Sequence, residues 1–298
     1  MLQRLEAYND GRQRAGYRPI KIGIGINTGI VILGTIGGAS RMDGTVIGDA
    51  VNLAARLERL TKEYRVSILI SEYTLYCLDQ PNLWSIRFLD RTHVRGKQDS
   101  QSVYEVFDAD PEPLRLAKQA TLRNFEEALA FYHLGRADLA QPLLHECLRI
   151  APDDRAVRVY LERCKELIRL GSPESIDQIG MDIGWRNEYS IGIHEIDAQH
   201  QDLLGIIAEL SHHVMIGKGQ TGPTMDLLAE QVSSMNSSEE NLMQRYDYPF
   251  MKDHIKQHLT FNRFFSELRR EIESGERDRL YLIFRIQMVL VDWQINHT

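Results

Sequence analysis

Two pairs of side chains in this sequence have types and spacings that suit chemistry. Asn52 and Arg56 stand four residues apart in the stretch VNLAARLERLTKEY, and His254 and His258 stand four apart in MKDHIKQH. Residues four apart share one face of a helix. Two imidazoles at this separation can bind the same metal ion. Asn52 and Arg56, taken alone, have two interpretations: a capping or solvent-facing helical pair, or part of a substrate site.

The glycine-rich stretches do not fit two familiar phosphate-binding motifs. KIGIGINTG, from Lys21 to Gly29, has the spacing GxGxxxG and no amphipathic helix directly after it, so it fails the dinucleotide fingerprint. No Gly-Lys-Ser or Gly-Lys-Thr follows Gly34, so the next glycines form no P-loop. Alone, these glycines predict a crowded strand followed by a tight turn.

The elements that must position these residues fall into three parts, and we expect a multi-domain chain. Residues 1–110 alternate β-branched runs such as IKIGIGI and VSILIS with helical patterns, which predicts an α+β domain. Residues 111–172 are helical in pattern and follow an acidic boundary with two prolines. Residues 173–298 contain four helical patterns with short connections, which predicts an all-α four-helix bundle.

The middle segment has the pattern of a paired-helix repeat. Its string FEEALAFYHLGRADLAQPLLHECLRIAPDD resembles one tetratricopeptide repeat, with small Ala128 and Ala140, a turn near Gly135, and Pro152 after the second helix. One such unit buries little apolar surface without stacked neighbours. It therefore has two interpretations, a connecting helical hairpin or a peptide-binding surface.

Composition limits the function classes. The 298 residues include 43% hydrophobic residues and carry a net charge of −7, which fits folded domains and argues against broad binding to nucleic acid. The three cysteines form no CxxC pair, which favours a reducing cytoplasm over a disulfide framework. No run of about 18 apolar residues is present, so we expect no membrane span and no export signal.

A longer motif surrounds Asn52 and Arg56. RMDGTVIGDAVNLAARLERLTK, together with GIGINTG before it and VRGK after it, resembles class III adenylate and guanylate cyclases in residue type, order and spacing. The resemblance covers about residues 20–107. It implies a partial ferredoxin-like catalytic domain that converts a nucleoside triphosphate to a cyclic nucleotide and diphosphate.

The resemblance also implies roles for five residues. In this chemistry the ribose 3′-hydroxyl attacks the α-phosphate, so a site must hold the ribose still and neutralise phosphoryl charge. By position, Asn52 would hold the ribose and Arg56 would stabilise the transition state, while Thr45 would contact the purine base. Lys97 would contact phosphate, with Arg95 close by. Threonine at position 45 favours ATP as substrate over GTP.

The cyclase resemblance lacks one part of the site. The two aspartates that bind Mg²⁺ or Mn²⁺ in the family match no residue of this chain, and they would lie before Met1. We therefore expect the chain to be catalytically incomplete alone. Family sites form between two catalytic domains, so a homodimer would lack the metal ligands and a heterodimer with a complete cyclase chain would supply them.

The C-terminal part carries a second family pattern. YSIGIHEIDAQHQDLL, EENLMQRYDYPFMKDHIKQH and DWQINH resemble bacteriohemerythrin, over about residues 185–298. The resemblance implies a bundle that binds iron and O₂. By position, the ligands would be His200, Glu239, His254, His258 and His297. Met235 stands where the family has a histidine, and the last aspartate of the family pattern has no counterpart, so we expect one iron, or a weak second one.

Three functions remain open from the sequence. The first is a cyclase domain regulated by a hemerythrin-type sensor of O₂ or iron. The second is an iron or oxygen binder with a vestigial cyclase segment. The third is a helical interaction protein with neither activity. Bound iron, cyclase activity with a complete partner, and specific partner capture would discriminate among them.

Overall fold

The computed structural model describes residues 1–38, 41–93, 100–171, 183–217 and 219–297. Contacts divide the chain into two compact units. The first contains residues 1–92, 102–126 and 143–163, and the second contains residues 93–101, 127–142 and 164–298. The chain is mixed α+β and mostly helical, with a small sheet near the N-terminus, as expected.

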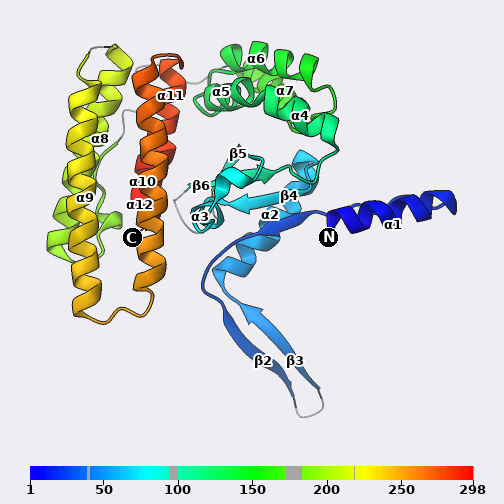
Figure 1. Cartoon of the computed structure of the whole chain (residues 1–298), viewed down its shortest axis with the longest axis horizontal. Helices are drawn as coiled ribbons and strands as arrows, with labels where there is room; N and C mark the ends of the chain where they lie inside the picture. Colours follow the sequence, from blue (N-terminus) through cyan, green and yellow to red (C-terminus); the bar gives the residue numbers. More distant parts are fainter. Residues whose placement is uncertain (39–40, 94–99, 172–182, 218, 298) are drawn as a thin grey trace. The chain divides into compact units, whose positions relative to one another are not determined.

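The first unit contains two separate sheets (Figure 1). Its elements up to the end of the sheet are α1 (Leu2–Arg14), β1 (Ile24–Ile26), β2 (Ile32–Gly38), β3 (Arg41–Ile47), α2 (Asp49–Tyr64), β4 (Ile68–Ser71), α3 (Glu72–Tyr76), β5 (Ile86–His93) and β6 (Ser100–Val106). The four-stranded sheet has the order β1-β4-β6-β5, with β1 parallel and β6 antiparallel to β4. Strands β2 and β3 form an antiparallel hairpin that extends away from this sheet.

Helix α2 packs directly on strand β1, and glycine makes this approach possible. A Cβ on Gly25 would lie 2.3 Å from the backbone nitrogen of Glu58, and one on Gly23 would lie 1.8 Å from the hydroxyl oxygen of Thr61. Neither position has room for a side chain, so only glycine allows the helix to lie against the strand backbone. The crowded strand predicted from the sequence is therefore present.

Four helices follow the sheet: α4 (Glu112–Ala120), α5 (Leu122–His133), α6 (Ala137–Ile150) and α7 (Arg155–Leu170). Phe125, Ala128 and Leu129 of α5 are fully buried, as are Ala140 and Leu144 of α6. This is the apolar face that the helical spacing predicts. Whether the helices form a tetratricopeptide-type unit stays a prediction.

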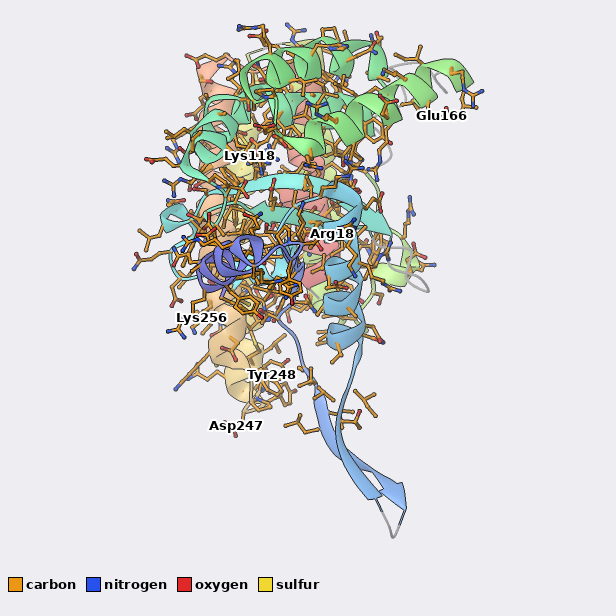
Figure 2. All side chains as sticks on the ribbon, turned by 90° about the vertical axis from the view of Figure 1, so that its right-hand side faces the viewer. Arg18, Lys118, Glu166, Asp247, Tyr248 and Lys256 are labelled. Atoms are coloured by element: carbon orange, nitrogen blue, oxygen red, sulfur yellow. The ribbon has the colours of Figure 1, made fainter. Side chains whose placement is uncertain are left out.

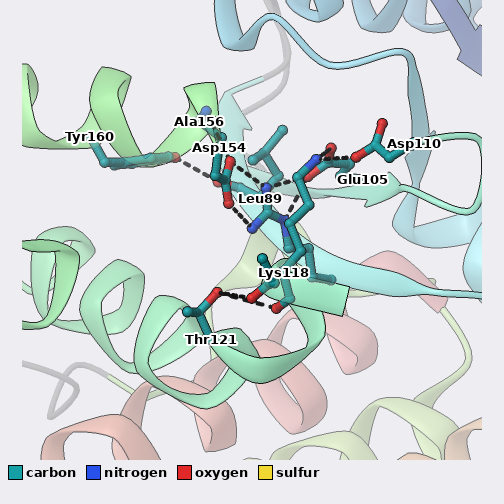
Figure 3. A network of polar contacts seen from close by, with 10 residues as sticks. Leu89, Glu105, Asp110, Lys118, Thr121, Asp154, Ala156 and Tyr160 are labelled. Atoms are coloured by element: carbon teal, nitrogen blue, oxygen red, sulfur yellow. Dashed lines mark hydrogen bonds and ion pairs between the residues drawn. The ribbon is translucent and has the colours of Figure 1, made fainter. Parts of the chain in front are cut away.

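A buried ionic network joins these helices to the sheet within the first unit (Figure 3). Arg87 of β5 donates to Glu105 of β6 at 2.6 Å and to both carboxylate oxygens of Asp154, just before α7, at 2.6 and 3.0 Å. Lys118 of α4 donates to Glu105 at 2.6 Å and to Asp110 at 2.5 Å. The network thus ties two strands and two helices together.

Charge balance explains how this network tolerates burial. Two cations face three carboxyl groups, and the extra one is Asp110, whose pKa burial raises. The pKa of Asp154 is instead lowered, because Arg87 outweighs the effect of burial. The Arg87 guanidinium also lies 4.1 Å from the ring centroid of Phe125. Burying a charge is costly unless it is paired, and here the pairing is nearly complete.

The same helices cover the outer edge of the sheet. Strand β5 is the last strand in the order, yet Arg87, Phe88, Leu89 and Asp90 are all buried. The hydroxyl of Tyr160 in α7 donates to the backbone carbonyl of Leu89 at 2.6 Å. A bare edge strand invites pairing with other chains. Helix α7 occupies this edge and satisfies one of its backbone acceptors.

The second unit contains the C-terminal helices, named here as α8 (His194–Ile216), α9 (Thr221–Arg245), α10 (Met251–Ser274), α11 (Arg279–Ile286) and α12 (Trp293–His297), with a π-helical turn at Gln287–Asp292. Helix α8 packs on α9, α9 on α10, and α11 on both α8 and α10. Helices α8 and α10 end at Gly217 and Gly275, both with positive φ. This left-handed ending suits glycine because it has no Cβ.

Part of the helical segment belongs to this second unit. Arg277, just before α11, donates to Glu127 of α5 at 2.8 Å, and both side chains are largely buried. The ring of His133, at the end of α5, stacks on Phe284 at a centroid distance of 5.6 Å. Helix α5 therefore contributes residues to both units.

In the part of the chain that the structure describes, no helix combines the length and apolar character needed to cross a membrane.

Replacing Asp154 by asparagine should destabilise the first unit strongly. The change leaves the fully buried Arg87 half paired, and breaking a buried ion pair costs about 3–5 kcal/mol. We expect a lower urea midpoint for Asp154→Asn at pH 7, measured by circular dichroism. The pKa of Asp154 is depressed by folding, so its contribution is present above the unfolded pKa of about 3.9 and is lost as pH falls further.

The exposed neighbour Asp153 supplies the control. Asp153→Asn should leave the midpoint unchanged. Equal midpoints for wild type and Asp154→Asn at pH 7 would show that the network does not stabilise the fold.

Candidate functional sites

The start of α2, where Asn52 lies, is fixed by the loop that follows β1. Asn27 donates to the backbone carbonyl of Ala50 at 3.2 Å and accepts from the hydroxyl of Ser71 at 2.6 Å. The backbone N–H of Thr28 donates to the hydroxyl of Thr74 at 2.9 Å. From the sequence, the glycines here predicted only a tight turn. An asparagine directly after a strand was the available signal, because its side chain readily bonds nearby backbone.

The two candidate catalytic residues share the outer part of this helix. Asn52 is exposed and Arg56, one turn later, is half-buried. Thr45 lies in β3, opposite Gly34 in the hairpin, and β3 leads through Gly48 directly into α2. The predicted base-contacting, ribose-contacting and phosphate-charge residues therefore follow one another along a single hairpin-to-helix path. Arg95 and Lys97 lie outside the described residues.

The C-terminal helices bring together four of the five predicted metal ligands. Glu239 of α9 directs one carboxylate oxygen toward His200 of α8, at 3.3 Å from its Nε2. Its other oxygen lies 3.2 Å from Nε2 of His254 and 3.1 Å from Nε2 of His258, both in α10. Ligand atoms of Glu239, His254 and His258 all lie within 4.8 Å of one another. The carboxylate thus stands between two groups of imidazoles from different helices.

Glu240 is a member of this cluster that the sequence analysis missed. Its Oε1 lies 2.9 Å from Nδ1 of His258, while Nε2 of the same ring faces Glu239. Although burial opposes the charged ring, the hydrogen bonds to Glu239 and Glu240 raise the pKa of His258. A carboxylate on the far ring nitrogen orients a metal-binding histidine and sets its tautomer. The Glu-Glu pair in the sequence was the signal.

The donors fit a metal ion on one side of Glu239 better than on the other. Two imidazoles and a carboxylate oxygen on the α10 side suit iron or zinc. On the α8 side, His200 faces the other oxygen of Glu239, and the fully buried Met235 lies one turn before Glu239 in α9. A thioether suits soft metals rather than iron bound by oxygen and nitrogen. His297 ends α12, and its side chain lies outside the described part of the structure.

A hollow between α9 and α10 is lined in part by His258 and Glu240. It is lined by Asn236, Glu240, Ile255, His258 and Asn262, among other residues of the two helices. Its lining includes the ring of His258 itself. The hollow therefore reaches the part of the cluster where Glu240 faces His258.

Glu240→Gln should weaken metal binding, because a neutral amide oxygen is a weaker acceptor for Nδ1–H of His258 than a carboxylate and no longer raises the basicity of the ring. Loss of such an outer partner lowers affinity by about 10–100-fold. The measurement is anaerobic Fe²⁺ titration of the full chain followed by iron analysis. Glu230→Gln, an exposed position on the same helix, is the matched control and should bind as wild type does. Wild-type affinity in Glu240→Gln would contradict the role of Glu240.

Met235→His should add a ligand beside His200. We expect bound iron to rise from about one toward about two per chain, since imidazole is an iron ligand and thioether a poor one. Met243→His, two turns further along α9, controls for the addition of a histidine. An unchanged iron content in Met235→His would show that the α8 side of Glu239 cannot hold a second ion.

Comparison with known proteins gives two separate likenesses. Residues 1–106 match the family model described as "Adenylate and Guanylate cyclase catalytic domain". The chain is 46% identical over 111 residues to the adenylate cyclase of Anabaena cylindrica, covering 36% of this chain and 22% of that one. It is 35% identical over 158 residues to the terminal-differentiation-specific adenylate cyclase of Dictyostelium discoideum, covering 52% of this chain and 7% of that one.

The second likeness is to a smaller protein. The chain is 30% identical over 115 residues to the bacteriohemerythrin of Pseudomonas paraeruginosa, covering 38% of this chain and 72% of that one. By contrast, it spans less than a quarter of the length of either cyclase relative.

Proposed function

Because the chain carries an adenylate and guanylate cyclase catalytic domain at residues 1–106 and belongs over a further 115 residues to the bacteriohemerythrin family, we propose that it is a cyclic-nucleotide signalling protein. Its first unit supplies part of an adenylate cyclase site, and its C-terminal helices form a four-helix bundle that senses iron or O₂. The observation that carries the cyclase role is the placement of Asn52 and Arg56 one turn apart on the open side of a firmly anchored helix.

The proposed chemistry assigns each residue a task in one displacement. The ribose 3′-hydroxyl of ATP attacks the α-phosphate, and diphosphate leaves. Asn52 holds the ribose so that the hydroxyl is aligned. Arg56 donates to the phosphoryl oxygens as charge gathers on them, which a planar guanidinium does well. Thr45 contacts the purine base, and Arg95 with Lys97 contacts the phosphates.

One set of observations supports adenylate rather than guanylate chemistry, and another supports a site shared with a second domain. Both cyclase relatives described above are adenylate cyclases, and position 45 is threonine. The hairpin and the segments on either side of it expose many large apolar side chains, among them Ile30 at 75%, Ile32 at 68% and Leu33 at 77%. Apolar surface of this kind marks an interaction site. A second catalytic domain, from a like chain or a complete cyclase, would cover it.

Mg²⁺ or Mn²⁺, held by aspartates of the second domain, would neutralise charge on the triphosphate when bound. This chain's own contribution is the asparagine, the arginine and the base contact. A homodimer would pair two equivalent halves, whereas a heterodimer with a complete cyclase would bring the metal ligands to Asn52 and Arg56.

The sensor role rests on the cluster around Glu239. Imidazoles from two helices and one central carboxylate suit iron, with the better-equipped position on the α10 side. Bound iron in such a site supplies a centre that responds to O₂ or to redox state. The segment 111–172, a helical tetratricopeptide-like connector in this proposal, transmits the change to the cyclase unit.

Arg56→Ala should abolish most cyclase activity in a complemented assay. The assay combines the full chain with the catalytic domain of the Anabaena cylindrica enzyme in which that domain's own equivalent asparagine and arginine are alanine. Activity then depends on the pair in this chain. Removing one transition-state donor costs about 10²–10³ in kcat, measured as cyclic AMP formed from ATP.

Arg59→Ala, an exposed arginine on the same helix, should leave kcat within about twofold of wild type. Equal rates for Arg56→Ala and wild type would contradict the proposed cyclase role.

A second candidate function is favoured by the histidine cluster alone. The chain would then be an iron or oxygen binder whose cyclase segment no longer works. Bound iron together with a complemented rate that does not depend on Asn52 or Arg56 would support this alternative.

A further inference from the structure

Helix α7 contacts the C-terminal end of α2, the helix that carries Asn52 and Arg56. Arg163 of α7 donates to the hydroxyl of Tyr64 at 2.8 Å and pairs with the carboxylate of Glu63, and these are the last two residues of α2. The guanidinium also lies 4.9 Å from the ring centroid of Tyr64 and 5.1 Å from that of Tyr160. Cation–π contacts of this kind add to the ionic ones.

Tyr64 in turn anchors α2 to the sheet. It is fully buried, and its hydroxyl donates to Asp90 of β5. Its ring stacks on Tyr160 at a centroid distance of 6.0 Å, with an angle of 18° between the planes. Burial, and then the Asp90 carboxylate, raise the pKa of Tyr64, so the hydroxyl stays protonated and donating. All these residues belong to the first unit.

Because α2 is a straight helix, contacts at its C-terminal end affect the position of Arg56. Eight residues separate Arg56 from Tyr64, which is about 12 Å at about 1.5 Å per residue. Asn27 holds the other end of α2, and glycines let its middle lie on β1. Contacts at both ends keep α2 from tilting, whereas loss of the contacts at one end lets α2 change its angle to β1. A shift of about 1 Å in a catalytic side chain can cost about a hundredfold in rate.

Arg163 lies well beyond residue 106, where the match to the cyclase family model ends. We propose that Arg163 is a positioning residue for the cyclase site, and that α7 controls the site by setting the orientation of α2. This inference rests on the proposed cyclase function. It identifies α7, whose residues from Cys164 onward belong to the second unit, as the element through which that unit would act.

The test compares Arg163→Met with a matched control on the same helix. Arg169 pairs with Glu166, labelled in Figure 2, and Arg169 is largely exposed. In the complemented assay we expect Arg163→Met to lower kcat about tenfold with little change in the KM for ATP, and Arg169→Met to match wild type. A urea unfolding curve of each variant gives its folded fraction, so that loss of folded protein is not mistaken for loss of positioning.

Hydrogen exchange of each full chain alone supplies a readout that needs no activity. Arg163→Met should speed exchange along α2 from residue 49 to residue 64 by at least about fivefold, and leave β4 unchanged. Faster exchange confined to the last turn of α2, or a kcat equal to that of Arg169→Met, would overturn the inference. If Arg56→Ala leaves the rate unchanged, the cyclase role fails, and hydrogen exchange alone then decides whether Arg163 positions α2.

Discussion

The buried guanidinium of Arg87 is the constraint on which the first unit depends. It lies in strand β5 and is almost completely shielded from solvent, so its charged N–H donors need protein partners. Glu105 of β6 and Asp154 before α7 meet that need from two directions. Satisfying one buried charge therefore joins β5 to β6 and brings α7 onto the edge of the sheet.

The position of α7 on the sheet edge determines which of its side chains can contact α2. Tyr160 and Arg163 lie in the second and third turns of α7 and reach β5 and the end of α2. The candidate nucleotide residues are thus placed by contacts at a distance: glycines under the helix, Asn27 at its start and Tyr64 at its end. The candidate catalytic side chains Asn52 and Arg56 lie away from these contacts, which hold α2 in position.

The sequence predicted the parts of the fold that repeat locally. The α+β N-terminal part, the later helices and the approach of Glu239, His254 and His258 follow from periodicity and from family spacing. The ionic network could not be predicted, because 67 residues separate Arg87 from Asp154 and no local pattern connects them. The same holds for Arg163 and Tyr64, which are 99 residues apart.

Other misses have local causes. Glu240 was not predicted as part of the cluster, and only the direction of the His258 ring shows its role. The π-helical turn before Trp293 could not be predicted from hydrophobic spacing, because it covers only six residues, most of them apolar, in which no single helical period stands out. Trp293 nevertheless stacks on Phe261 at a centroid distance of 3.9 Å, which keeps the last helix packed against α10.

We propose that a change in metal binding among the C-terminal helices reaches α2 through α7. The decisive comparison is the hydrogen exchange of residues 49–64 in the iron-free and the iron-loaded full chain. A change of more than about twofold in the exchange of these amides, with β4 unaffected, is the expected result. Identical exchange along α2 in the two states would contradict the claim, whatever iron the chain binds.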